Sequence, residues 1–292
     1  MDWVVLSATG RLARVKLEES PWKARATQPN TRVDHDVIAS TAPAVGGEVG
    51  AVTASGTAYL INADACEELA PGGPWSLWNG HLADSLVAAG EHVVGLFSLD
   101  LDAPPLALAT REGVVKRVVP EYKGWDSWEV MAVKDGDQIV GAAHASDTDE
   151  LAFVTVEAQL LRLSAREVRP QGRAAGGMAG IKLAPGSDVI FFTAVAKDDR
   201  DDAIVATLAS GGDSAATMKI TPFLDYPAKG RATSGVRTHR FLKGQDHLGL
   251  AWVGIPPVRA CDSTGAPRNL PSAQDRRDAT GSKVYGPFYA FG

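Results

Sequence analysis

Residues 151–195 read LAFVTVEAQLLRLSAREVRPQGRAAGGMAGIKLAPGSDVIFFTAV and contain the pattern that decides the fold. Two apolar runs separated by a short turn predict a β-hairpin. A basic, glycine-rich loop follows at 169–177, and the final apolar run is typical of a strand that is buried on both faces. The expected strands are 151–156, 160–164, 180–183 and 188–195. This segment therefore predicts one four-stranded unit.

The beginning of this unit recurs along the chain. An apolar run ends in Ser or Thr, and a turn and a second strand follow it. The turns lie at positions 10, 56, 113, 158, 211 and 265, so the pattern recurs about every 45 to 57 residues. Repeats of this length are typical of propeller-like rings in which each unit is one small sheet.

We therefore predict an all-β, single-domain fold, a six-bladed ring of four-stranded antiparallel blades. The approximate units are 3–45, 47–100, 105–147, 149–199, 201–257 and 258–292. Residues 267–292 fit the repeat poorly, so they are expected either to be partly disordered or to close the ring.

The composition agrees with many short strands joined by turns. Among 292 residues, 45% are hydrophobic, and 30 Gly and 17 Pro are spread along the chain. Two cysteines, Cys66 and Cys261, cannot form a disulfide framework, which favours a reducing cytoplasm. The sequence contains neither a signal peptide nor an apolar run of about 18 residues, so no membrane association is expected. Because Met1 leads directly into an apolar strand, we expect the chain to be part of a longer protein.

The sequence offers little for catalysis. Its six histidines are scattered and its two cysteines are far apart, so no metal site is predicted. It contains neither a phosphate-binding loop nor a nucleophile elbow, so no catalytic residues and no cofactor are expected. The pairs Trp75/Trp78 and Trp125/Trp128 are interpreted as packing between units, with a partner-contact patch as the alternative.

The charge is divided by segment. The net charge of −6 argues on average against a nucleic-acid binder, but residues 33–110 hold ten acidic residues and no Lys or Arg. Residues 226–244 hold five bases and no acid. Because the local potential decides what a surface attracts, basic faces are expected in spite of the net charge.

The loops 169–173 and 229–231 occupy equivalent places in adjacent units, and their bases lie beside glycines. Glycine lets a backbone approach a phosphate closely. Bases placed in an arc around a ring can follow bent duplex DNA through its phosphates, without reading base sequence. The candidate DNA-binding residues are Arg11, Arg14, Lys16, Lys23, Arg25, Lys116, Arg117, Arg162, Arg169, Arg173, Lys182, Lys229, Arg231, Arg237, Arg240 and Lys243.

The chain resembles the C-terminal domain of the A subunits of bacterial type IIA topoisomerases, DNA gyrase and topoisomerase IV. The strings that carry the resemblance are SATGRLAR at 7–14, TREGVVKR at 110–117, QGRAAGGMAGIKL at 171–183 and KGRATSGVR at 229–237. The resemblance covers residues 3–255 and fades in the last unit.

The resemblance implies a β-pinwheel, a six-bladed ring that binds and bends double-stranded DNA on its outer rim. It also implies partners, namely the N-terminal part of the A subunit and the ATPase B subunit in an A2B2 assembly in the cytoplasm, at the nucleoid. In the family, the DNA-cleaving tyrosine follows an arginine and lies in the N-terminal part of the A subunit. No tyrosine of this chain follows an arginine, so the cleavage site is not expected in it.

One departure from the family concerns activity. Gyrases carry a Gln-Arg-Arg-Gly-Gly-Lys-Gly box in the first basic loop, whereas residues 20–32 of this chain read SPWKARATQPNTR. The missing double arginine and paired glycines imply relaxation and decatenation, as by topoisomerase IV. The alternatives are gyrase-like wrapping of DNA and a protein-interaction propeller outside DNA metabolism; an enzymatic propeller is third. We hypothesise that DNA runs along units three, four, five and one and avoids the acidic unit two.

Overall fold

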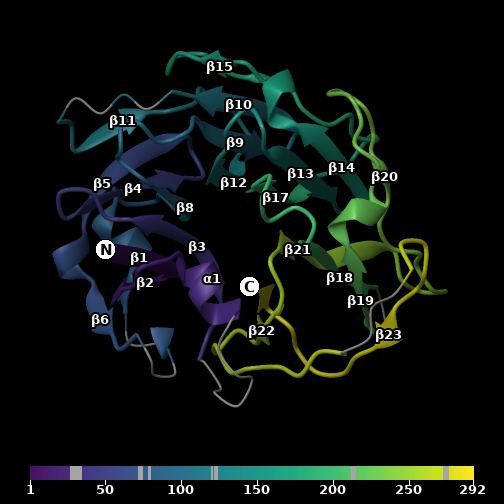
Figure 1. Ribbon diagram of the computed structural model, residues 1–292. Helices are drawn as coiled ribbons and strands as arrows, with labels where there is room; N and C mark the ends of the chain where they lie inside the picture. The colour runs from purple at the N-terminus through teal and green to yellow at the C-terminus, as the bar shows by residue number, and fades with distance from the viewer. Residues whose placement is uncertain are drawn as a thin grey trace.

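The computed structural model describes residues 1–26, 35–71, 75–77, 80–119, 121, 124–211, 215–271 and 276–292. Small sheets follow one another around a ring (Figure 1). Each of these sheets is a blade, and the blades are numbered in chain order. The one α-helix of the described residues, α1, spans Pro21–Ala26.

Five blades contain four or five described strands, which run in order from the inner edge of the sheet to the outer. Blade 1 consists of β3 (Ile38–Pro43), β1 (Asp2–Ser7), β2 (Arg11–Lys16), and both β6 (Glu67–Leu69) and β7 (His81–Leu82). Blade 2 consists of β8 (Val93–Phe97), β4 (Glu48–Thr53), β5 (Thr57–Asn62) and β11 (Ser127–Glu129). Blade 3 consists of β12 (Ile139–His144), β9 (Leu106–Thr110), β10 (Val114–Val118), and both β15 (Pro170–Gln171) and β16 (Met178–Ala179).

Blade 4 consists of β17 (Val189–Val195), β13 (Glu150–Thr155), β14 (Gln159–Ser164) and β20 (Val236–Arg237). Blade 5 consists of β21 (His247–Gly254), β18 (Ile204–Ser210), β19 (Thr217–Pro222) and β23 (Ser282–Lys283). The short 3-10 helices are η1 (Ala63–Ala65), η3 (Ala83–Leu86), η4 (Ala165–Glu167) and η5 (Phe223–Asp225).

The predicted all-β ring of small sheets is confirmed, but the number of blades is wrong. In the described part of the chain, the expected sixth unit forms only a two-stranded sheet of β22 (Ala260–Cys261) and β24 (Ala290–Phe291). Residues 256–292 contain five prolines, which cannot donate backbone hydrogen bonds to a ladder. The blades are also not purely antiparallel, because β2 pairs with β6 and β10 pairs with β15 in parallel.

The outer strand of every blade comes from the next segment of the chain. β6 and β7 follow blade 1's own strands and pair back with β2, and β20 likewise pairs back with β14. The expectation that each unit is one sheet is therefore wrong for the outer strand of each blade, which comes from the following unit. The predicted strand 180–183 is replaced by β16, which pairs with β10 of the preceding blade. This exchange ties neighbouring blades together.

The repeated turns adopt the backbone conformation that their residues favour. Gly10, Gly56 and Gly113 have φ of 80°, 87° and 83°, where glycine carries no Cβ penalty. Ala158 takes the same place at φ 60°. The turns lie between the first two strands of their blades, as predicted.

The core lies between the blades. The inner strands of neighbouring blades pack against one another, as β12 does with both β8 and β17. Within blade 4, Phe153 on β13 and Phe192 on β17 have ring centroids 4.8 Å apart with the rings tilted by 57°. Trp75 and Trp128 are buried, which confirms the packing interpretation for them; Trp125 is 38% exposed, and Trp78 lies outside the described residues.

The end of the chain closes the ring against blade 1. The amide of Asp36 donates to the carbonyl of Gly265 at 2.7 Å, and the Cys261 thiol donates to Asp36 Oδ1 at 3.6 Å. Gly292 lies against the backbone of Ile38. Ring closure is thus the alternative that holds for the described part of 267–292. No helix in the described ranges is both long and apolar enough to span a membrane.

Candidate nucleic-acid interface

Four of the sixteen predicted DNA-binding side chains are buried. Arg117 on β10 is 1% exposed, and its guanidinium donates to Val168 O at 2.6 Å, Ala145 O at 3.0 Å and Asp147 Oδ1 at 2.5 Å. Each of its three nitrogen atoms thus donates a hydrogen bond to the protein itself. It cannot contact a phosphate in this conformation.

Lys116 and Arg162 are enclosed in the same way. Lys116 Nζ donates to Val130 O at 2.7 Å and Arg173 O at 2.6 Å, and burial lowers its pKa to about 8. Arg162 binds both carboxylate oxygens of Glu150 and donates to Tyr226 O at 2.9 Å. The signal for burial is present in the sequence, because these bases stand within apolar strand runs.

Arg25 is the fourth buried base. Its guanidinium lies 4.7 Å from the centre of the Trp75 ring. Burial, and then the nearby charge of Arg259, lower the pKa of Arg25 to about 10. The prediction of DNA contacts is therefore wrong for the four buried bases, Lys116, Arg117, Arg162 and Arg25. The prediction used their place in the repeat, which does not show whether a side chain reaches the surface.

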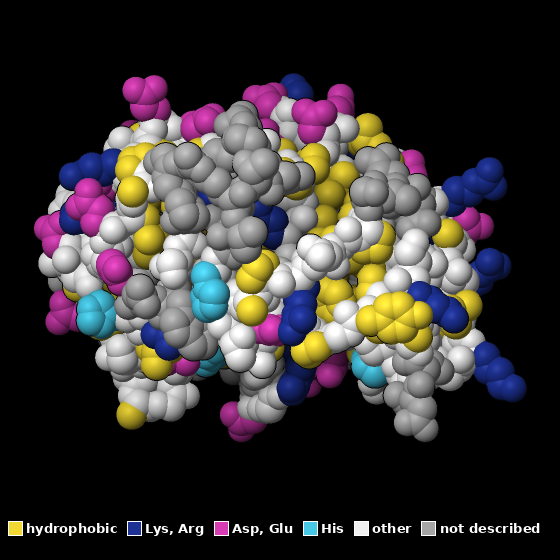
Figure 2. Space-filling view, turned by 90° about the horizontal axis from the view of Figure 1, so that it is seen from below, with side chains coloured by type: hydrophobic (Ala, Val, Ile, Leu, Met, Phe, Trp, Pro, Cys, Tyr) yellow, Lys and Arg dark blue, Asp and Glu magenta, His cyan; other side chains and the backbone are white. Residues whose placement is uncertain are grey.

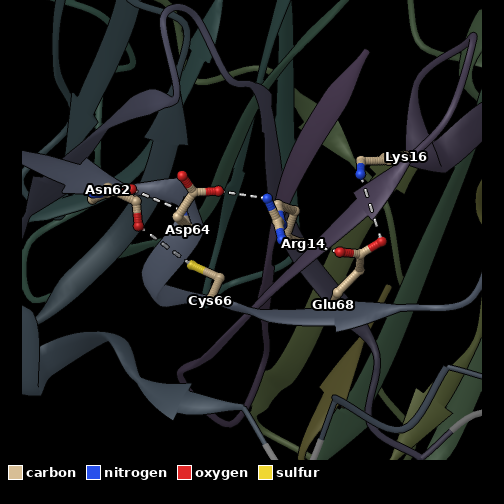
Figure 3. Close-up of polar contacts among 6 residues, drawn as sticks. All are labelled: Arg14, Lys16, Asn62, Asp64, Cys66 and Glu68. Carbon is tan, nitrogen blue, oxygen red and sulfur yellow. Dashed lines mark hydrogen bonds and ion pairs between the residues drawn. The ribbon is translucent and has the colours of Figure 1, made fainter.

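The bases of blade 1 are exposed or half-buried, but acids from other segments pair with them. Arg14 lies between Asp64 and Glu68, at 2.6 Å and 3.0 Å (Figure 3). Lys16 Nζ is 3.8 Å from the second oxygen of Glu68. Arg11 donates to Gly80 O, and Lys23 pairs with Asp199 at 3.0 Å. The segment around β6, which carries Asp64, Glu67 and Glu68, forms an acidic rim.

The remaining predicted bases gather at the outer edges of blades 3 and 4. The loops 168–183 and 228–237 lie side by side, because the amide of Lys182 donates to Thr233 O at 3.0 Å. Arg231 Nη1 also donates to Ala179 O at 2.7 Å. Six of these bases are exposed and Arg173 and Arg231 are half-buried; the exposed ones are Arg169, Lys182, Lys229, Arg237, Arg240 and Lys243.

The closing segment extends this surface to blade 5. Arg277 Nη1 donates to Arg237 O at 3.2 Å, and the amide of Arg240 donates to Ala279 O at 3.2 Å. Arg276, Arg277 and Lys283 thereby join the arc. Sequence reasoning missed them because this segment did not fit the repeat, although the Arg276-Arg277 pair was a visible signal.

These eleven bases together form a basic rim. Figure 2 views the ring from below and shows Lys and Arg side chains projecting from the right-hand edge, the side on which β20 and β23 lie in Figure 1. Acids at the rim include Glu167, which accepts from the amide of Arg231, Glu121, which lies 3.9 Å from Arg173, and the exposed Asp278, which follows Arg277 in the chain. Charges on one surface add within a Debye length of about 8 Å at physiological salt. The rim is thus suited to a polyanion.

The described residues contain no group of three or more His, Cys, Asp or Glu that could hold a metal ion. Within them, the chemistry that this surface offers is therefore binding by exposed ammonium and guanidinium groups. Residues 27–32 of the first basic loop lie outside the described residues.

The chain is similar to known proteins in sequence and fold. Residues 149–197 and 214–248, which include both basic loops, match the family model for the DNA gyrase C-terminal domain, beta-propeller. The DNA gyrase A subunit of Deinococcus deserti is 36% identical over 143 residues, which cover 44% of this chain and 16% of the relative. That of Escherichia coli K12 is 31% identical over 192 residues, which cover 60% of this chain and 21% of the relative.

Two solved structures share the fold. The C-terminal domain of a DNA topoisomerase IV superposes with a TM-score of 0.74 at 18% identity, covering 100% of this chain and 93% of that one. A DNA gyrase A C-terminal domain superposes with a TM-score of 0.68 at 17% identity, covering 100% of this chain and 99% of that one. The chain spans 16% to 21% of the length of the two curated gyrase relatives. The resemblance to C-terminal domains of type IIA topoisomerase A subunits is confirmed.

Proposed function

We propose that this chain, as a relative of the C-terminal domains of type IIA topoisomerase A subunits, binds and bends duplex DNA on its basic rim. The observation that carries the proposal is the continuity of the rim over blades 3, 4 and 5. Loops from three separate segments are joined there by direct hydrogen bonds, such as that from Arg277 to Arg237. Exposed bases on neighbouring blades thus form one surface.

The physical basis is contact with phosphates. Duplex DNA carries one negative charge per about 1.7 Å of helix axis, so a row of bases releases counterions on binding. Because the rim follows the curve of the ring, a duplex that meets all of it must bend. Bending costs several kcal/mol, and many phosphate contacts must offset that cost.

The proposed DNA path is shorter than the one expected from the sequence. Blade 1 was included in that path, but Arg14 and Lys16 are paired with acids of the acidic rim. Blades 3 to 5 and the closing segment therefore support the path, and blade 1 is left out of it.

The chain would present a DNA segment to an ATP-dependent type IIA topoisomerase of A2B2 composition in the cytoplasm. We assign it to relaxation and decatenation, as by topoisomerase IV. The described part of the first basic loop supports this assignment, because Lys23 is paired with Asp199 and Arg25 is buried against Trp75. Burial thus removes Arg25 from a gyrase-like grip on DNA, and an acid competes with phosphate for Lys23.

The test is a topology and binding experiment with the chain as it stands. Nicked plasmid is mixed with the protein and ligated, and its linking number is read on a gel; affinity for a linear duplex is measured over a range of salt. We expect salt-dependent binding with little change of linking number. A shift that grows with protein concentration would favour gyrase-like wrapping, and no binding at low salt would favour the protein-interaction propeller.

A matched pair of charge reversals locates the surface. Arg237→Glu changes the basic rim, and Lys16→Glu makes the same change of charge at an exposed position beside the acidic rim. We expect the first to weaken DNA binding and the second to leave it nearly unchanged. Equal effects of the two would contradict the proposed path.

A further inference from the structure

A basic residue occupies the same position of the middle strand in four of the five blades. Arg14, Arg117, Arg162 and Lys219 lie opposite Val4, Ala107, Ala152 and Thr207 in their strand ladders. Each of these partners stands three residues before the Ser or Thr that ends its strand. In blade 2 the corresponding residue is Leu60, opposite Gly50.

Each of these bases reaches the segment that the next unit contributes to its blade. Arg117 donates to the carbonyl of Val168, directly before Arg169, and Arg162 donates to that of Tyr226, three residues before Lys229. Lys219 donates to the carbonyls of Arg277 and Ala279.

Lys116 adds a second hold on blade 3. It donates to the carbonyl of Arg173, while its neighbour Arg117 holds Val168. The loop that carries Arg169 and Arg173 is thus bound at both ends by buried bases. The segments that carry Arg169 and Arg173, Lys229 and Arg231, and Arg276 and Arg277 are each held by such a bond.

The outer strands need this support because they are short. β15, β20 and β23 are two residues long, so their ladders supply few hydrogen bonds. Charge-assisted hydrogen bonds are about twice as strong as neutral ones, and a buried carbonyl left without a donor is costly. A buried base can therefore decide where an exposed segment lies.

We propose that Lys116, Arg117, Arg162 and Lys219 are positioning residues for DNA binding, which hold the exposed bases of the basic rim along one duplex without touching DNA themselves. The inference rests on the proposed function. Arg14 has the same position, but it reaches the carboxylates of Asp64 and Glu68 and so holds a segment that repels phosphate.

The test compares Arg117→Met with Leu60→Met, the matched position of blade 2. Because Arg117→Met would release the exposed carboxylate of Asp147, it is made together with Asp147→Asn, which keeps the net charge of the pair. We expect roughly tenfold weaker DNA binding near 0.1 M salt. We also expect the slope of log affinity against log salt to fall by about one to two units, as Arg169 and Arg173 leave the DNA. Leu60→Met should change neither quantity, and Arg117→Lys should restore part of the slope.

Loss of stability is separated from loss of position by a second control. Val5→Ala removes buried volume in blade 1 and should leave the salt slope unchanged at temperatures where the chain is folded. If Arg117→Met does not fold, Lys116→Met makes the same test, because Lys116 binds the other end of the loop. Faster hydrogen exchange of residues 168–176 in the variant would support the positioning role.

The outcomes distinguish the two proposals. A folded Arg117→Met or Lys116→Met with the wild-type affinity and slope overturns the positioning role and leaves the proposed function intact. A wild-type chain that binds no DNA overturns the proposed function, and this inference with it.

Discussion

The acidic rim of blade 1 and the basic rim of blades 3 to 5 are built in the same way and present opposite charge. In both, a base on the middle strand binds a segment that the next unit contributes. At blade 1 that segment brings Asp64 and Glu68, which are 75% and 51% exposed and pair with Arg14. At blade 3 it brings Arg169 and Arg173, and Arg117 binds this segment through the carbonyl of Val168, while its carboxylate partner, Asp147, lies outside the segment.

The exchanged segment therefore sets the potential of each blade edge. A base that binds this segment through its backbone carbonyls leaves the side chains of the segment available for a ligand, even where a carboxylate outside the segment also binds the base, as Asp147 binds Arg117. A base that binds carboxylates of the segment itself, as Arg14 does, is neutralised with them. The net charge of −6 therefore says little about either rim.

The largest expected effect comes from reversing the basic rim at two blades. Arg169→Glu combined with Arg237→Glu should weaken DNA binding about 100-fold at 0.1 M salt, because two phosphate contacts become repulsions. Fluorescence anisotropy with a labelled duplex measures the change. Lys16→Glu combined with Lys197→Glu makes the same change of charge away from the rim, because Lys197 is exposed just after the inner strand β17. A comparable loss there would contradict a difference between the two rims.

Acidification should lower the free energy of unfolding through His239, which lies under the closing segment at blade 5. Burial, and then the charge of Lys219, lower the pKa of His239 to about 4, and His239 Nε2 donates to Thr280 O in the closing segment. The unfolded chain takes up a proton near pH 6.5, whereas the folded chain does so near 4. The stabilising contribution is thus complete above about pH 6.5 and falls by about 1.4 kcal/mol per pH unit between about 6.5 and 4.

Urea unfolding at pH 7, 6 and 5 measures this effect. His239→Gln should flatten the dependence on pH, since the group that titrates differently in the two states is removed. If the free energy of unfolding falls as steeply with pH in the variant as in the wild type, groups other than His239 cause the dependence.

Neutralising the acidic rim should make blade 1 resemble blade 3 in its attraction for DNA. Asp64→Asn combined with Glu68→Gln keeps the side-chain shapes and releases Arg14 and Lys16 from their ion pairs. We expect DNA affinity to rise about threefold and the salt slope to steepen by about one unit, as a phosphate contact is gained. The matched change Asp246→Asn, at an exposed site on blade 5, should have a smaller effect; an unchanged slope in the double variant would place blade 1 outside the reach of DNA.

The smallest effect is expected from a glycine of the basic rim. A Cβ at Gly172 would meet no heavy atom within 4 Å, so Gly172→Ala should fold and gain a few tenths of a kcal/mol in the free energy of unfolding. If a phosphate approaches the backbone there, affinity should fall about twofold. Gly186→Ala, outside the basic rim, lies at φ 77° and should instead lose stability with unchanged affinity. Isothermal titration calorimetry measures the DNA affinity of each variant, and urea unfolding of the same samples measures the free energy of unfolding.

Part of the candidate site could be predicted from the sequence. The predictions that failed all concern where a base lies in the folded ring. The loops 169–173 and 229–231 were recognised as equivalent, and the structure brings their segments side by side. Arg117 and Arg162 were assigned to the same surface because they are bases in equivalent repeats, yet they are buried. Arg276 and Arg277 were missed because their segment does not fit the repeat, and its contact with Arg237 of blade 4 forms only in the folded ring.

The residues alone are enough to predict a repeated all-β ring and a charge that is divided by segment. Both properties are local, since alternating apolar runs, glycine turns and the sign of neighbouring charges are read within a few residues. Three features depend on the folded ring: which blade receives each outer strand, which bases face inward, and that the last unit gives β23 to blade 5 and keeps only β22 and β24 as a sheet of its own among the described residues. These depend on hydrogen bonds between segments about 50 residues apart, such as Arg117 to Val168, whose free energy appears only when the ring brings both ends together.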